Sequence, residues 1–154
     1  MTQINCVQNV LAAVALAMAS AGGVLAADDQ PHRTADGLTV YLGVMPAAMV
    51  KGRPEAAMHG GVPAGRHAYH VMVGVFDEAS GARLAGLAVK AAVASLGMAA
   101  TEKRLETMRI ADTETYGNYF NLIGAGPYRI RIEILRPQAA APTRVEFTYQ
   151  HGLR

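Results

Sequence analysis

Residues 128–135 read Tyr-Arg-Ile-Arg-Ile-Glu-Ile-Leu. Every second residue from Tyr128 onward is apolar, and the residues between them are Arg129, Arg131 and Glu133. Side chains of a strand alternate between the two faces of a sheet, so this pattern predicts a strand with one buried and one solvated face. The stretch therefore indicates a sheet that covers a core on one side only.

The same signal recurs along the chain, between turn residues. The expected strands cover residues 38–45, 67–76, 83–93, 104–111, 117–123, 128–135 and 144–149. The alanines of residues 83–93 equally permit a helix. Seven short strands without an amphipathic helix predict an all-β fold, an antiparallel β-sandwich of immunoglobulin-like type. Such sandwiches often place a tyrosine that hydrogen-bonds to upstream backbone where Gly126-Pro-Tyr128 stands.

The start of the chain has the pattern of an export signal. Val10 to Ala21 is apolar, and Val24-Leu-Ala26 offers the small residues that a signal peptidase reads. A retained membrane anchor is the alternative, but the apolar run is shorter than the roughly 20 residues that a spanning helix needs. We expect a cleaved signal peptide at residues 1–26 and a periplasmic location.

The mature protein should then have a flexible lead-in at residues 27–37 and one domain at residues 38–154. Cys6, the single cysteine, leaves with the signal peptide. The mature chain can therefore form no disulfide, and zinc sites built on cysteine spacing are excluded.

Charge and motifs argue against several functions. The 14 basic and 12 acidic residues are scattered, so nucleic acid is not an expected partner. The chain has no Gly-x-Ser-x-Gly motif and no phosphate-binding glycine loop, so we do not expect an enzyme. Asp112 and Glu114 are explained as turn residues or as acids that support metal ligands, although an envelope hydrolase built on paired carboxylates is a weaker alternative.

Residues 58–72 hold three of the five histidines and two methionines. Imidazole nitrogen together with thioether sulfur suits copper, because soft sulfur favours Cu(I) and imidazole accepts Cu(I) and Cu(II). Alternation places His70 on one strand face and Tyr69 on the other. The candidate metal ligands are Met108, His59, His70, His67, Met58 and Met49. The opposing interpretation is that methionine fills the core and histidine lies at the surface.

Several short segments occur in the order found in one known family. They are Val40-Tyr-Leu, Met45-Pro with Met49, Asp77 to Gly81-Ala, Met108 to Ala111-Asp112 and Tyr116-Gly117, Tyr128 to Arg-Pro137, and Phe147-Thr-Tyr. The chain thereby resembles the periplasmic iron-transport-associated copper-binding proteins. The resemblance implies a small exported immunoglobulin-like sandwich that binds copper through histidine and methionine beside an acidic residue. It also implies a homodimer that accompanies an inner-membrane iron permease.

The resemblance carries over to some ligand positions and not to others. Met108 falls on the family's methionine ligand. Thr115 stands where the family has a histidine before its Tyr-Gly pair, and the other family histidines have counterparts among His59, His67 and His70.

Two functions follow from the sequence. The first is a periplasmic copper-binding protein, with iron as the other metal, that stores or delivers metal or supports its transport. The second is a non-metal accessory module of an envelope complex. The first predicts that the histidine and methionine side chains converge on one point, and the second predicts that they scatter.

Overall fold

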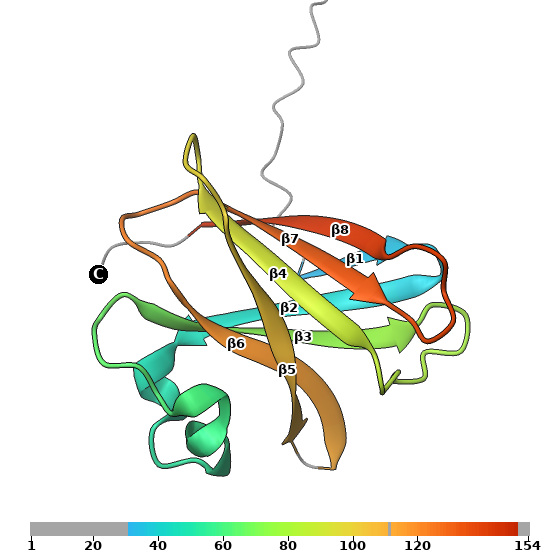
Figure 1. The fold of residues 1–154 in the computed structure, drawn as a ribbon, viewed down its shortest axis with the longest axis horizontal. Coiled ribbons are helices and arrows are strands. Elements are labelled where there is room, and N and C mark those ends of the chain that lie inside the picture. Colours follow the sequence, from blue (N-terminus) through green and yellow to red (C-terminus); the bar gives the residue numbers. More distant parts are fainter. Residues whose placement is uncertain (1–30, 111, 151–154) are drawn as a thin grey trace, which may run out of the picture.

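The computed structural model describes residues 31–110 and 112–150 (Figure 1). The export signal and residues 27–30 of the lead-in lie outside the described residues. Within those that are described, no helix is long and apolar enough to cross a membrane. The strands are β1 (His32–Ala35), β2 (Leu38–Pro46), β3 (Ala68–Asp77), β4 (Ala88–Ser95), β5 (Thr101–Ile110), β6 (Thr113–Asn121), β7 (Tyr128–Leu135) and β8 (Thr143–Tyr149).

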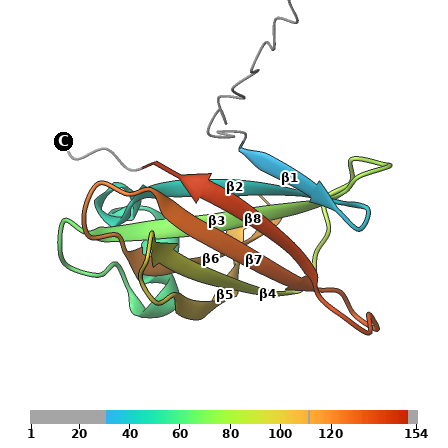
Figure 2. The same ribbon diagram turned by 90° about the horizontal axis from the view of Figure 1, so that it is seen from above.

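All pairings are antiparallel, in the order β1-β2-β3-β6-β5-β4-β7-β8. The sheet curls into two packed layers, and β8 passes close to β1 (Figure 2). There Arg33 of β1 donates a 3.2 Å hydrogen bond from Nε to the backbone oxygen of Glu146 in β8. The predicted all-β, immunoglobulin-like sandwich is confirmed.

Strand β5 belongs to both layers. Its first half, Thr101 to Leu105, pairs with β4, and its second half, Glu106 to Ile110, pairs with β6. Its buried residues reflect this change: Leu105 enters the core, whereas Met108, three positions later, is buried on the opposite face. The strand thus carries a side chain out of the core and onto the outer face of the β2-β3-β6 layer.

The core lies between the layers and follows the period-two pattern. In β7 the apolar positions from Tyr128 to Ile134 are buried, while Arg129 and Arg131 are exposed. In β3 the odd-numbered residues from Tyr69 to Val75 enter the same core. Each fully buried Val, Leu or Ile side chain contributes about 1.5–3 kcal/mol, so these rows hold the layers together.

The corner before β7 also forms as predicted. The Tyr128 hydroxyl donates a 2.6 Å hydrogen bond to the backbone oxygen of Ile123, and burial raises the pKa of this phenol. Tyr128 therefore ties the β6–β7 connection to the strand that follows it.

The structure differs from the sequence-based expectation at β1. This strand falls inside the segment 27–37 that was assigned to a flexible lead-in, and its residues 32–35 pair with β2. Asp36 and Gly37 join the two strands with φ of 49° and 74°. An Asp-Gly pair with two positive φ values is the preferred connection of a tight hairpin, which the sequence analysis missed.

The long segment between β2 and β3 was expected to be a loop. It contains two short 3₁₀ helices, η1 (Ala47–Val50) and η2 (Pro54–Gly60). They lie on the outer side of the β2-β3-β6 layer, near β5 (Figure 1). A segment in this place covers side chains that point away from the main core.

Candidate metal centre

His70 lies on the outer face of β3. Its neighbours Tyr69 and Val71 point into the core, so alternation directs His70 the other way. The side chain is nevertheless only 1% exposed, because a small apolar cluster of Ala47, Ala68 and Tyr119 lies on the same side of the sheet. An imidazole is therefore held away from water outside the main core.

Met108 reaches the same region from β5. It is 0% exposed, and the register places it opposite Thr115 of β6. Its sulfur is 3.1 Å from Nε2 of His59 in η2. Segments that are about fifty residues apart in the chain thus bring a thioether and an imidazole together.

The backbone at His59 is unusual. His59 has φ 58° and ψ 29°, within the left-handed region, so η2 is interrupted there. Such a conformation is uncommon for a residue with a side chain and often occurs at functional sites. The result is a fully buried His59 side chain, whose ring centroid lies 5.4 Å from that of His70.

Gly117 marks the point where two donor atoms converge. A Cβ atom added at Gly117 would lie 2.8 Å from Nε2 of His70 and 3.2 Å from Sδ of Met108. The room that the absent side chain of Gly117 leaves is occupied by the end of Met108, whose Cε would lie 2.6 Å from such a Cβ, and by the His70 ring, so the two donor atoms lie close together over β6. Since His59 Nε2 is next to Met108 Sδ, three donors from three elements meet there.

The donor set fits a soft metal ion. His59 Nδ1 is 2.8 Å from Oε2 of Glu106, and a carboxylate accepts hydrogen bonds, so Nδ1 carries the proton. In the neutral ring, Nε2 then has a lone pair facing the lone pairs of the Met108 sulfur. A nitrogen and a sulfur each about 2.0–2.3 Å from one metal ion lie roughly 3–4 Å apart, and the observed separation agrees.

Metal sites built from imidazole, thiolate and carboxylate groups alone are not found in the part of the chain that the structure describes. Among residues 31–110 and 112–150, no three His, Cys, Asp or Glu side chains gather as a metal-ligand group. The candidate centre depends on the thioether of Met108 in addition to imidazole. This mixture suits copper better than magnesium, calcium or structural zinc.

Tyr119 forms one wall of the centre. Its ring centroid lies 4.8 Å from that of His70 and 5.7 Å from that of His59. Its hydroxyl is buried without a hydrogen-bond partner among the described residues, and burial raises the pKa of the phenol. This wall excludes water from the donors.

The other candidate ligands occupy different places. Met58 is half-buried beside His59, Met49 is 59% exposed on η1, and the His67 ring accepts a 3.1 Å hydrogen bond from Nε of Arg66. Met49 thus lies at the surface, and the hydrogen bond of His67 is made with its sequence neighbour. The structure thus brings His59, His70 and Met108 together.

Thr115 and Glu114 serve a different contact. Thr115 Oγ1 accepts a hydrogen bond from Arg83, and a Glu114 oxygen accepts from the Tyr116 hydroxyl at 2.5 Å and from the Gly86 amide at 2.7 Å. These bonds, chiefly that from Tyr116, hold the pKa of Glu114 below its ordinary value. The acid that approaches the candidate ligands is Glu106, not Glu114.

Glu106, Gly117 and Tyr119 also belong to the centre, and they are not among the residues that the sequence predicts for it. A signal existed for Glu106, because alternation puts it on the same strand face as Met108 two residues later. Gly117 is part of the Tyr-Gly pair that contributed to the family resemblance. Nothing in the sequence pattern connects Tyr119 with His59.

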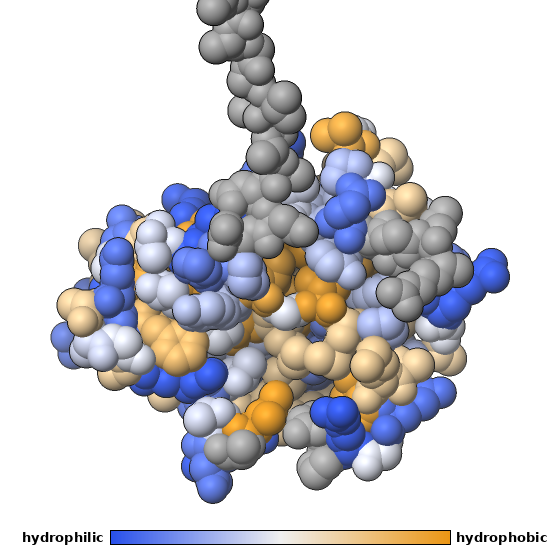
Figure 3. Space-filling view, turned by 180° about the vertical axis from the view of Figure 1, so that it is seen from behind, coloured by the Kyte–Doolittle hydropathy of each residue, from blue (hydrophilic) through white to orange (hydrophobic). Residues whose placement is uncertain are grey.

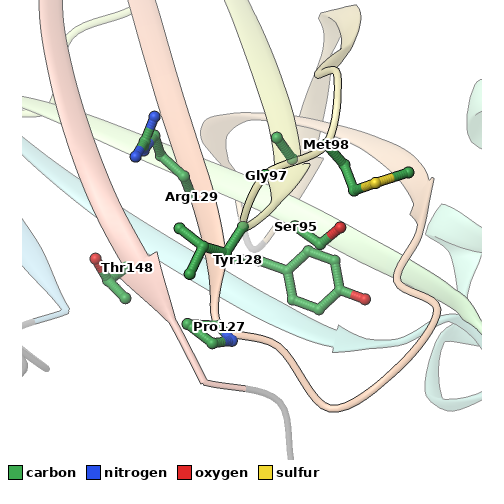
Figure 4. A pocket seen from close by; sticks show the side chains of 9 residues that line it. Ser95, Gly97, Met98, Pro127, Tyr128, Arg129 and Thr148 are labelled. Carbon is green, nitrogen blue, oxygen red and sulfur yellow. The ribbon is translucent and has the colours of Figure 1, made fainter.

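Two hollows of the molecule lie apart from the three donors. One, of about 120 Å³, lies at the β4–β5 turn beside Pro127 and Tyr128 and has no imidazole or carboxylate in its lining (Figure 4). The other, of about 400 Å³, is an open groove beside Tyr41, Met72 and Arg83. Neither hollow has the paired titratable groups of a hydrolase.

Apolar side chains gather across the middle of the face seen from behind (Figure 3).

Fold and side chains together define a class of protein: an immunoglobulin-like sandwich with two imidazoles and a thioether gathered on the outer face of its sheet. No family model matches the chain, and no curated protein matches it. Solved structures with the same fold do exist, and they include copper-bound proteins.

One is a copper-bound single-residue variant of FetP from uropathogenic Escherichia coli strain F11, with 15% identity and a TM-score of 0.63 over 81% of this chain and 97% of that chain. Copper-reconstituted P19 from Campylobacter jejuni has 11% identity and a TM-score of 0.64 over 78% of this chain and 92% of that chain. A DUF4426 family protein from Pseudomonas aeruginosa PAO1 has 15% identity and a TM-score of 0.60 over 80% of this chain and 94% of that chain. The structural resemblance to FetP and P19 is shown, and at these identities the shared property is the fold.

Proposed function

We propose that this protein is a periplasmic copper-binding protein that holds one copper ion between His59, His70 and Met108. The convergence of these three side chains carries the proposal. Two donors lie within 3.2 Å of one point, and the third lies 3.1 Å from the second. The accessory-module alternative predicts scattered histidine and methionine side chains, so the convergence favours the copper site over it.

The structural neighbours support copper as the metal. FetP and P19 are described as copper-bound or copper-reconstituted proteins. The DUF4426 protein has the same fold without such a description, so the fold alone does not select copper. The donor set of this chain adds what the fold lacks, because two imidazoles and a thioether suit Cu(I) and tolerate Cu(II).

Each ligand would have a distinct role. His70 and Met108 sit on strands and supply fixed donors, whereas His59 sits on the η2 segment and closes the site from outside. The buried surroundings would keep water from the metal, and η2 would have to move for metal to enter or leave. This arrangement suits storage or delivery of copper, or support of iron transport, rather than catalysis.

The periplasmic location is supported by the sequence and by one structural neighbour, and the partners are inferred from the family resemblance. FetP has been produced in the periplasm of E. coli, which agrees with the export signal of this chain. The cleavage near Ala26, pairing as a homodimer, a partnership with an inner-membrane metal permease and a role for Met58 as a further ligand belong to the same proposal. They derive from the sequence and from the family resemblance.

The test is an anaerobic Cu(I) titration of the mature protein against a chromophoric chelator. We expect one tight equivalent for the wild type and an affinity at least tenfold weaker for Met108→Leu and His70→Ala. Met49→Leu and His67→Ala are matched controls, because they remove the same chemical groups outside the three-donor cluster. If the wild type fails to compete, the accessory-module function replaces this proposal.

A further inference from the structure

We infer that Glu106 is a positioning residue for His59: its carboxylate fixes the tautomer and the direction of the ring so that Nε2 faces the metal. This inference rests on the proposed copper site and extends it to a group outside the donor set. The observation behind it is the 2.8 Å contact between Glu106 Oε2 and His59 Nδ1, on the ring side opposite Met108.

Glu106 and Met108 lie on one face of β5, two residues apart. The His59 ring spans the gap between them, with Nδ1 toward the carboxylate and Nε2 toward the sulfur. One rigid strand therefore provides both a donor to the metal and the anchor for a second donor. Any shift of β5 would move the two together.

His59 needs such an anchor because its own segment is weakly built. The residue interrupts η2 with a left-handed backbone, and Gly60 and Gly61 follow it with φ of 79° and 92°. A short 3₁₀ segment that ends in two glycines does not by itself hold a ring in one direction. The hydrogen bond to Glu106 supplies that restraint from a neighbouring strand.

Glu106 is positioned as an anchor rather than as a ligand. Its side chain is 55% exposed, whereas that of His59 is fully buried, so the carboxylate lies at the rim and reaches the outer nitrogen of the ring. Among the described residues, no Lys or Arg lies within ion-pair distance of Glu106. The carboxylate is thus available to the imidazole without competition from a fixed cation in that part of the chain.

The chemical consequence concerns which nitrogen holds the proton. A neutral imidazole has one N–H, and a carboxylate at Nδ1 selects the form whose Nε2 lone pair can bind metal. The same contact makes Nε2 a stronger donor, and loss of such partners typically lowers metal affinity about 10–100-fold. Glu106 would therefore control the affinity of the site without touching the metal.

The experiment uses the mature protein and two readouts. Nitrogen-15 NMR of the metal-free protein at one fixed neutral pH reports the His59 tautomer, and Cu(I) competition reports affinity. Glu106→Ala should shift the ring toward the Nε2–H form and weaken Cu(I) binding about 10–100-fold. Glu106→Gln keeps an oxygen acceptor and should retain the Nδ1–H form and most of the affinity. Glu102→Ala is the control, because Glu102 lies on the same strand, is 59% exposed and pairs with Lys90.

Several results would overturn the inference. If Glu106→Ala has the same His59 tautomer as the wild type, Glu106 does not orient the ring. If that variant has the wild-type Cu(I) affinity, Glu106 does not control metal binding. If Glu106→Gln keeps the tautomer but loses as much affinity as Glu106→Ala, the carboxylate is a direct ligand instead. If the wild type binds no Cu(I), the proposed function fails, while the NMR measurement still decides whether Glu106 orients His59.

Discussion

Gly117 shows how one missing side chain permits the site. An alanine Cβ there would lie 2.6 Å from Cε and 3.2 Å from Sδ of Met108, and 2.8 Å from Nε2 of His70. These separations are below ordinary van der Waals contact, and both neighbours are buried, so the donors must shift. We expect Gly117→Ala to weaken Cu(I) binding more than tenfold, measured by chelator competition.

The matched control for this change is Gly43→Ala. Its added Cβ would meet the flexible end of Met72 at 3.3 Å on the neighbouring strand, outside the donor cluster. This variant should keep wild-type affinity. Overpacking at Gly117 costs about 1–3 kcal/mol of stability, and the flexible end of Met72 can yield to Gly43→Ala at a smaller cost, so the urea midpoint of each variant is measured beside its affinity. Equal affinities for Gly117→Ala and the wild type would place the metal elsewhere.

At this scale the sequence predicted part of the site. Alternation separated His70 from Tyr69, and the family resemblance singled out Met108, because both residues lie on regular strands. The choice among His59, His67 and His70 as neighbours of Met108 stayed open. It depends on the left-handed backbone at His59, a conformation that tertiary contacts stabilise and that local sequence does not encode.

A buried phenol ties down the β6–β7 connection, to which the Gln150 side chain also donates a 3.1 Å hydrogen bond at the Ala125 backbone oxygen. Tyr128 is 3% exposed, and its hydroxyl donates to the Ile123 backbone oxygen at 2.6 Å. Removing the hydroxyl leaves the Ile123 backbone oxygen without this hydrogen bond, which lowers the free energy of unfolding by about 1–3 kcal/mol. Tyr128→Phe should therefore lower the urea midpoint at an unchanged m-value. The Cu(I) affinity should stay at the wild-type value, and a coupled loss would show that this corner supports the site.

Period-two alternation predicted the central strands well, and errors occurred at the turns. Residues 112–116 were expected to form a turn, yet β6 begins at Thr113, and Asp112 with φ of 61° makes the connection tighter. Residues 83–87 were expected in the third strand, but β4 begins at Ala88. Strand ends depend on hydrogen-bonding partners from distant segments, which the local pattern does not contain.

Tyr116 joins the two layers of the molecule. It is fully buried in β6, its hydroxyl donates to Glu114, and it accepts a 3.0 Å hydrogen bond from the amide of Leu87 just before β4. Burial, followed by the bond to Glu114, raises the pKa of Tyr116 to about 12. The protonated phenol is therefore part of the folded structure, whereas an unfolded tyrosine loses its proton near pH 10.

This difference gives stability a defined dependence on pH. A raised pKa in the folded state contributes stability that is complete below about pH 10 and falls as the pH rises toward 12. The stability gap between the wild type and Tyr116→Phe should therefore shrink by about 1 kcal/mol between pH 9 and pH 11, measured by urea unfolding. A constant gap for Tyr116→Phe would contradict the assignment.

The three donors lie on the outer face of the sheet, covered by a segment that contributes little to the main core. Evolution can therefore change the chemistry of such a molecule one residue at a time, since exchanging His59 or Met108 leaves the rows of valine and isoleucine between the layers intact. Proteins that share this fold can therefore lose a metal site, bind a different metal or acquire a new site while the core stays the same. The fold indicates common ancestry, whereas the metal-binding chemistry has to be inferred from the donor residues of each protein.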